Sequence, residues 1–264
     1  MIVLLLVTSV GAGLFFAAHK WNRAMIRREQ AARRLAAERE YVRRTVDMVL
    51  DPSLTAEEQL LIIDGFIPRL RARGVPDPRL GQLRGRLVVV NDLTPKARTL
   101  LDRVRKAAWT IHSSRIKRLK LLDDIANDII LPREIWEIAH LLLTQSLLTK
   151  RQHEARRAVV TTPEFEAVLA PQEAALRRSI EATMERVVVV EEYARRVQEA
   201  DAALLAQEML RDNDQYRDLL ARTDDVEGMR HLTHQAVAAS EVLAKSVREA
   251  IEVGQMLIAP ESTR

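Results

Sequence analysis

The chain has 264 residues, with 41 Lys and Arg against 37 Asp and Glu, a net charge of +4 and no cysteine. The absence of cysteine excludes disulfides, thiolate metal sites and cysteine nucleophiles. Aromatic residues make up only 4% of the chain, which argues against a stacking platform for single-stranded nucleic acid. Eight Gly and nine Pro are too few for the turns of an all-β fold, and a 47% hydrophobic content is too high for a disordered chain.

The first 18 residues, Met1 to Ala18, carry no charged side chain. As a helix they would be roughly 27 Å long, close to the thickness of the bilayer hydrocarbon core. A cleaved signal peptide is the alternative. However, no Lys or Arg precedes the apolar run, and Phe16 stands where a cleavage site needs a small side chain. The sequence therefore predicts an uncleaved, single-pass transmembrane anchor (a signal anchor) over residues 1–18.

Basic residues follow this segment directly. By the positive-inside rule, their position predicts that the N-terminus lies outside and that the chain after residue 19 is cytoplasmic, at the inner (cytoplasmic) membrane. Arg outnumbers Lys by 34 to 7, a composition typical of GC-rich bacterial genomes. The residues expected near the lipid headgroups are Lys20, Trp21, Arg23, Arg27, Arg28, Arg33 and Arg34.

Prolines and capping residues divide the rest of the chain into helix-length segments. A basic juxtamembrane helix is expected over 19–50, because apolar residues recur at a 4-3 spacing until Asp51-Pro52 ends the pattern. Short helices are expected over 52–91, opened by a capping box at Thr55-Ala-Glu-Glu58.

A basic-to-apolar helical hairpin is expected over 94–160. Its first helix starts at Thr94-Pro95 and is expected to end at Leu131-Pro132. Its second helix has an apolar face that includes Ile138 and Leu142.

Long acidic helices are expected over 163–258, followed by a tail over 259–264. A cap at Thr161-Thr-Pro-Glu164 starts this region, Pro171 opens a long helix, and Asp224-Asp225 precede the last one. Asp201 interrupts the heptad seam of the long helix. That seam comprises Leu176, Ile180, Val187, Val190, Ala194, Val197 and Leu204.

Two β-branched runs, Leu87–Val90 and Val187–Val190, favour strands by composition. The second run lies inside a sustained heptad pattern, and periodicity over that length outweighs four residues. We therefore assign neither run to a strand. The predicted fold class is all-α: an N-terminal single transmembrane helix that continues into an elongated cytoplasmic helical bundle or coiled-coil region.

The charge is unevenly divided along the chain. Residues 19–44 carry a net +6, residues 45–68 −5, residues 69–120 +12 and residues 121–264 −9. Three alternatives remain open for the block 69–120: docking on anionic lipid, binding nucleic acid, or pairing with the acidic C-terminal half of the chain. No nucleic-acid-binding signature accompanies the block, so self-pairing and membrane docking are favoured. We define the basic block by Arg69, Arg71, Arg73, Arg103, Arg105, Lys106, Arg115, Lys117, Arg118 and Lys120.

Two spacings resemble metal-ligand pairs. Glu137-Ile-Ala-His140 places a carboxylate and an imidazole on one helix face, but di-iron bundles need two such motifs and only one is present. His231-Leu-Thr-His234 puts two imidazoles on one turn, and nothing in the sequence brings that turn to His140. We therefore predict no catalytic, cofactor-binding or metal-binding residues, and no enzymatic activity.

These features together predict a membrane-anchored cytoplasmic helical scaffold or adaptor. It would act near the inner leaflet through helix–helix association, with itself or with a protein partner. The alternative is a membrane-tethered protein that binds nucleic acid or anionic lipid through residues 69–120. A helical-bundle metal enzyme is a third and less favoured interpretation.

Overall fold

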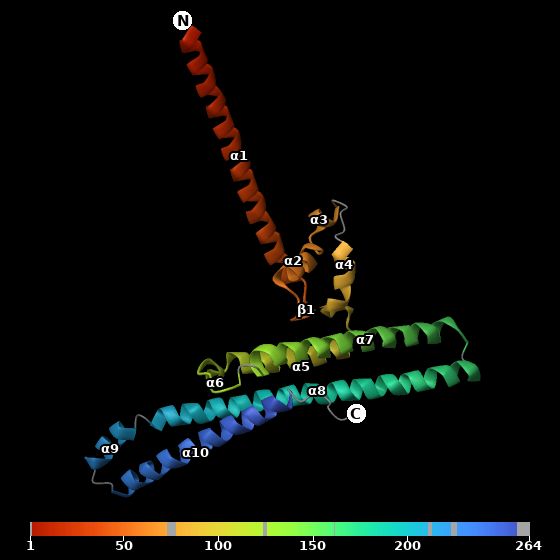
Figure 1. Ribbon diagram of the computed structural model, residues 1–264. Helices are drawn as coiled ribbons and strands as arrows, with labels where there is room; N and C mark the ends of the chain where they lie inside the picture. The colour runs from red at the N-terminus through yellow and green to blue at the C-terminus, as the bar shows by residue number, and fades with distance from the viewer. Residues whose placement is uncertain are drawn as a thin grey trace. The chain divides into compact units, whose positions relative to one another are not determined.

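The computed structural model describes residues 2–72, 78–123, 126–160, 162–210, 213–222 and 226–257. For 2–20, 22–24, 71–72, 78–80, 126, 213–214, 217 and 226–237 it describes the backbone alone. Helices make up most of the described chain, which confirms the all-α prediction (Figure 1). The chain divides into two compact units: the first comprises Met1–Met48 and Ser53–Leu87, and the second comprises Val49–Pro52 and Val88–Arg264.

The first unit contains α1 (Ile2–Thr45), α2 (Ala56–Asp64), α3 (Pro68–Ala72), α4 (Pro78–Leu83) and the 3-10 turn η1 (Arg84–Arg86). Its small core consists of Val42 from α1 with Ile63 and Ile67. Arg39 of α1 donates two hydrogen bonds of 2.7 Å to the carboxylate of Asp64. This paired contact joins α1 to α2 beside the apolar cluster.

The capping box at the start of α2 is confirmed. The backbone N–H of Glu58 donates to Thr55 Oγ1 at 3.3 Å, and the backbone N–H of Thr55 donates to Glu58 Oε2 at 2.8 Å. The two bonds satisfy donors that have no partner within the helix.

The end of the first helix and the run at Leu87 differ from the sequence prediction. Helix α1 ends at Thr45, before the expected end at Leu50. Strands β1 (Met48–Leu50) and β2 (Leu87–Val89) pair as a two-stranded sheet. Val88 is fully buried and Val49 packs against the core of the second unit, so both β-branched side chains gain burial in the extended conformation.

The second unit is built around one long helix. It contains η2 (Val90–Asp92), α5 (Pro95–Ser113), α6 (Arg115–Arg118), the π-helical turn η3 (Ala126–Ile130), α7 (Leu131–Ala158), α8 (Pro163–Met209), α9 (Asn213–Ala221) and α10 (Val226–Met256). Helices α5, α7 and α10 all pack on α8. From Val187 onward, the predicted heptad seam of α8 belongs to the core of this unit. Of the two earlier members, Leu176 is buried and Ile180 is half-buried.

The predicted helix from Pro95 to Leu131 is wrong, although its start at Thr94 is confirmed. Helix α5 ends at Ser113, and the buried Ser114 caps α6 by accepting a hydrogen bond from the Lys117 backbone N–H at 3.3 Å. Pro132 lies in the first turn of α7 instead of ending a helix. Proline is tolerated there because first-turn N–H groups have no partner within the helix.

The prediction that Pro171 opens the long helix is also wrong, because α8 already begins at Pro163. Thr162 caps it by accepting a hydrogen bond from the Phe165 backbone N–H at 3.2 Å. Pro171 is exposed, so water can bond the carbonyl that loses its intrahelical partner. Helix α10 begins directly after Asp224-Asp225, as predicted, whereas the separate α9 was not anticipated.

In the described part of the chain, no helix is long and apolar enough to cross a membrane. The side chains of the predicted span over 1–18, and those of Lys20 and Arg23, lie outside the described residues. Trp21 is 71% exposed. The other predicted headgroup-proximal residues, Arg27, Arg28, Arg33 and Arg34, are exposed on α1.

Candidate functional site

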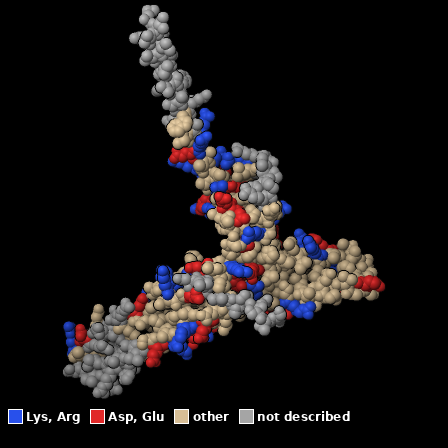
Figure 2. Space-filling model, viewed as in Figure 1, with Lys and Arg blue, Asp and Glu red and all other residues tan. Residues whose placement is uncertain are grey.

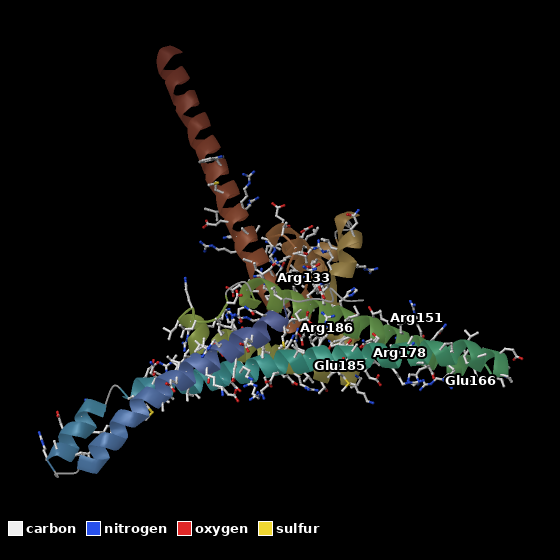
Figure 3. The ribbon with its side chains drawn as sticks, turned by 60° about the horizontal axis from the view of Figure 1, so that its bottom comes forward. Arg133, Arg151, Glu166, Arg178, Glu185 and Arg186 are labelled. Carbon is white, nitrogen blue, oxygen red and sulfur yellow. The ribbon has the colours of Figure 1, made fainter. Side chains whose placement is uncertain are left out.

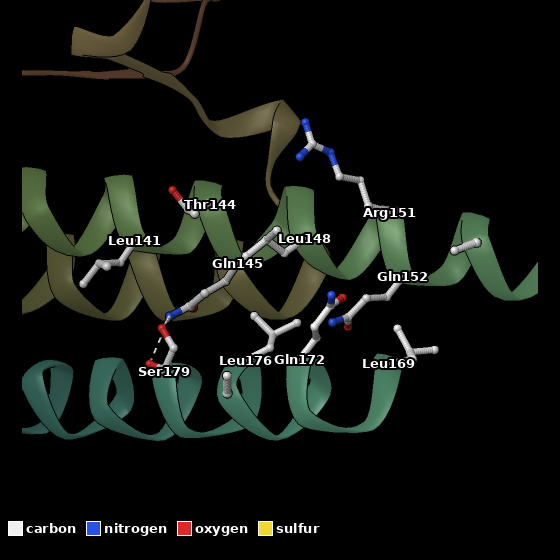
Figure 4. Close-up of a pocket in the computed structure, with 12 residues that line it drawn as sticks. Leu141, Thr144, Gln145, Leu148, Arg151, Gln152, Leu169, Gln172, Leu176 and Ser179 are labelled. Atoms are coloured by element: carbon white, nitrogen blue, oxygen red, sulfur yellow. Dashed lines mark hydrogen bonds between the residues drawn. The ribbon is translucent and has the colours of Figure 1, made fainter. Parts of the chain in front are cut away.

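A groove of about 600 Å³ lies between the C-terminal half of α7 and the N-terminal part of α8 (Figure 4). Its α7 wall follows a helical spacing of three and four residues, which places the lining side chains in one stripe. Its apolar lining consists of Leu141, Leu148, Ala155, Leu169, Ala175 and Leu176. Its polar lining consists of Thr144, Gln145, Arg151, Gln152, Gln172 and Ser179.

The groove lies on a part of the hairpin that extends past its neighbouring helices. Helices α5 and α10 pack on the later part of α8, through pairs such as Arg103–Glu191 and Arg196–Glu249. Figure 1 shows α7 and α8 continuing side by side beyond them. Two antiparallel helices leave a concave surface between them, and small side chains such as Ala155 and Ala175 keep this one open.

Gln145 forms the floor of the groove and is only 5% exposed. Its Nε2 donates to Ser179 O at 3.0 Å and to Ser179 Oγ at 2.9 Å (Figure 4). It also donates to Thr183 Oγ1 at 2.8 Å. A buried amide that is bonded only in one alignment of two helices fixes their axial register. Gln145 was not predicted as a site residue, although its spacing from Ile138 and Leu142 places it on the buried face of α7.

An ion-pair cluster lies on the hairpin at the α7 end nearest Leu131. Arg186 donates to both carboxylate oxygens of Glu134 at 2.7 and 2.8 Å, and to Glu137 at 2.8 Å. Burial raises the pKa of Glu137, but hydrogen bonds from Arg186 and Arg133 outweigh it, so its pKa lies below the ordinary value. The bond with Glu134 is the main reason why the pKa of Arg186 is raised.

A second cluster lies at the opposite end of the hairpin. Arg156 donates to Glu173 at 2.9 Å and to Glu166 at 3.1 Å, and the bond with Glu173 is the main cause of its raised pKa. Arg151 and Arg178 lie between the two clusters (Figure 3). Both are exposed, and neither forms an ion pair within the described residues. The groove therefore has paired charges at its ends and an unneutralised cation, Arg151, in its wall.

The structure separates the basic block into two groups, of which the first bonds acidic residues of the same chain. Arg103 donates to Glu191 at 2.7 and 2.6 Å, and Arg115 donates to Glu208 at 2.8 and 2.6 Å. Lys117 donates to Asp128 at 2.7 Å. In the first unit, Arg69 donates to Glu38 at 2.8 Å. On the face in Figure 2, basic and acidic residues are accordingly interspersed.

The second group points outward. Lys106, Arg118 and Lys120 are exposed and form no ion pair with any residue that the structure describes. Arg105 does not belong to this outward-pointing group, because its side chain is half-buried and already has an interaction partner. The side chains of Arg71 and Arg73 lie outside the described residues.

The residues considered as metal ligands are not brought together where the structure describes them. Glu137 bonds arginines, and the exposed His140 lies against the Trp136 ring at a centroid distance of 5.6 Å. Among the described side chains, no group of three or more His, Asp or Glu could hold a metal ion, and His231 and His234 lie outside that set. Comparison with protein-family models, with curated proteins and with solved structures finds no match to this chain.

Proposed function

We propose that the protein is a membrane-anchored helical scaffold or adaptor that binds an amphipathic helix in the α7–α8 groove. Its N-terminus lies outside, and the chain after residue 19 lies on the cytoplasmic side. The observation that carries the proposal is the groove: an apolar stripe with Arg151 in its wall, at a part of the hairpin that α5 and α10 do not cover.

The anchor is supported by the chain before Trp21. Residues 1–18 are uncharged and long enough for the hydrocarbon core, and six Lys and Arg follow within the next 16 residues. The backbone of α1 is one continuous helix of 44 residues, roughly 66 Å long. A span at its start would therefore continue directly into the exposed, arginine-rich part of the same helix.

The groove sets the chemistry of its partner. A helix that packs in it would cover Leu148, which is 41% exposed, and would complete a three-helix arrangement. Arg151 would lose water in that complex and needs a carboxylate to compensate. We therefore infer a partner helix with one apolar face flanked by Asp or Glu, contributed by another protein or by a second copy of the chain.

The test compares two neighbouring positions on α7. A photoreactive amino acid that replaces Leu148 would face the groove. The same substitution at Leu147 is the control, because the Leu147 side chain is 47% exposed and does not line the groove. In cells, position 148 is expected to give a discrete adduct whose peptide maps to an acidic amphipathic helix. Arg151→Glu should abolish that adduct. A peptide from this chain would identify self-association, and equal labelling at 147 and 148 would contradict the proposal.

A further inference from the structure

The C-terminus of α6 has an unusual residue for its conformation. The backbone N–H of Leu121 donates to Ile116 O at 3.0 Å, and that of Lys120 donates to Lys117 O at 2.9 Å, the two bonds of a Schellman motif. Lys120 has a φ of 56°, the left-handed conformation for which glycine is strongly preferred. Glycine would adopt this conformation without strain, so the Lys120 side chain can be removed by Lys120→Gly without a cost to the backbone.

Large apolar side chains are exposed on α6, on the residues that follow it, and on α5 and η3, which adjoin it. Leu119 is 54% exposed, Leu121 39%, Trp109 of α5 69% and Ile129 of η3 63%. The ion pair between Lys117 and Asp128 joins α6 to η3, next to Ile129. A hollow of about 270 Å³ is lined by residues of α5, α6, η3 and α7, including Trp109 and Lys117, so these segments adjoin one another there.

We propose that this surface docks on an anionic membrane leaflet. The α6 surface, as we name it, comprises Lys106, Trp109, Arg118, Leu119, Lys120, Leu121 and Ile129. Its apolar side chains enter the interfacial layer, and its cations lie at the level of the acidic headgroups. The inference rests on the proposed anchor only for the identity of the bilayer, and it does not depend on the groove.

The combination of side chains favours lipid over nucleic acid. Each Lys or Arg near an anionic leaflet adds attraction, and Trp prefers the membrane–water interface. Exposed Leu and Ile gain burial in the acyl boundary but gain little from a phosphodiester backbone. The exposed carboxylate of Asp128 is already bonded to Lys117, so it does not oppose the headgroups as an unpaired charge.

The test uses the full chain in vesicles and one tryptophan at a time. The chain has three Trp, so Trp21→Phe with Trp136→Phe leaves Trp109 as the only reporter. Brominated lipid is expected to quench the fluorescence of Trp109 severalfold more in mixed vesicles of phosphatidylglycerol and phosphatidylcholine than in vesicles of phosphatidylcholine alone. High salt should reduce the difference. The variant that keeps only Trp136 should show no dependence on lipid charge.

Lys120→Gly separates docking from folding. Glycine relieves the left-handed strain, so the thermal unfolding temperature should stay the same or rise, while the removal of one cation should lower the quenching of Trp109. Leu119→Ser should lower the quenching as well. Lys96→Ala removes an exposed cation near the opposite end of α5 and serves as the control that leaves quenching unchanged.

Equal quenching of Trp109 in the two lipids would overturn the proposal. A salt-sensitive shift of its emission by an oligonucleotide, without quenching by lipid, would overturn it in favour of nucleic acid. A change in Trp109 emission that depends only on protein concentration, and not on lipid, would indicate that a second copy of the chain covers this surface instead. A variant that keeps only Trp21 reports the anchor separately, because an inserted anchor should give quenching in both lipids.

Discussion

The carboxylate of Asp201 in α8 caps the N-terminus of α6, which lies more than 80 residues earlier in the chain. It accepts hydrogen bonds from the backbone N–H groups of Arg115 at 3.0 Å and Ile116 at 2.8 Å. The Arg115 side chain in turn bonds Glu208, two helical turns further along α8. The short α6 is thus bound to α8 at two points: its first backbone N–H groups bond Asp201, and the Arg115 side chain bonds Glu208.

Asp201→Ala is expected to lower the free energy of unfolding by about 1–2 kcal/mol, because two N–H groups of the first turn lose their acceptor. Urea denaturation followed by circular dichroism measures the loss. Amide hydrogen exchange should accelerate at Arg115 and Ile116. Asp102→Ala removes an exposed aspartate of α5 and should change neither quantity.

Gly254→Ala is expected to destabilise the contact between α10 and α8. An added Cβ would lie 3.0 Å from Tyr193 Cζ, and that ring is 1% exposed and held by a 2.9 Å hydrogen bond from its hydroxyl to Asn127 Oδ1. Burial raises the pKa of Tyr193 to about 12, although the Asn127 bond acts in the opposite direction. The overpacking should cost about 1–3 kcal/mol in thermal or urea unfolding.

Gly85→Ala is the control for this prediction, because an added Cβ there meets nothing within 4 Å. It should leave stability unchanged or slightly raise it, since alanine restricts the unfolded chain. An equal loss of stability in both variants would show that Tyr193 is not the cause.

Gln145→Leu is expected to loosen the register of the α7–α8 hairpin with little change in stability. A buried amide can often be replaced by an apolar group of similar size at small net cost, while alignment is lost. The chain has no cysteine, so Leu147→Cys and Val168→Cys can carry spin labels. The distance distribution between them should broaden in Gln145→Leu and stay narrow in Gln152→Leu, which lines the groove but leaves the Gln145 bonds in place.

The free energy of unfolding should decrease as the pH is lowered past about 4.3, the ordinary pKa of Glu. A hydrogen bond from Arg103 lowers the pKa of Glu191. The pKa of Glu192 is lowered to about 2, mainly by a hydrogen bond from Arg195. A carboxylate with a lowered folded-state pKa stabilises the fold fully above its unfolded-state pKa, and this contribution is lost as the pH falls through the folded-state pKa.

The contribution of one pair can be isolated by substitution. Glu191→Gln should make the acid-induced loss of unfolding free energy shallower, as measured by urea denaturation at several pH values between 7 and 2. Glu185→Gln removes an exposed carboxylate that bonds no arginine in the described chain, so its slope should match that of the parent. A parent-like slope in Glu191→Gln would contradict the assignment to the Arg103–Glu191 pair.

Local chemistry made much of the helical fold predictable. The caps at Thr55, Thr94 and Thr162 lie where the sequence placed them, because capping depends on neighbours within four residues. The break at Ser114 was not predicted, because Ile111 and Leu122 are about three helical turns apart and so remain in phase. Periodicity does not reveal where a helix axis turns. Pairing of β1 with β2 also depends on residues about 40 positions apart.

The candidate site was only partly predictable. The apolar face of α7 follows from periodicity, and Ile138 and Leu142 are buried as expected. The groove depends instead on the absence of large side chains at Ala155 and Ala175. Both residues are ordinary helix formers in the sequence, and their effect shows only when the two helices lie side by side. Asp201 looked like a defect in the seam for the same reason: the N–H groups that it accepts come from a distant part of the chain.

The uninterrupted α8 has a consequence for how many partners the second unit can hold at once. Leu176 lines the groove and Asp201 caps the helix that carries the α6 surface, and 25 residues of one helix separate them by about 40 Å. A partner helix confined to the groove, whose α8 lining runs from Leu169 to Ser179, would not reach as far as Asp201. The two surfaces are therefore expected to be filled independently, so that one chain could recruit a protein while its opposite end remains on the membrane.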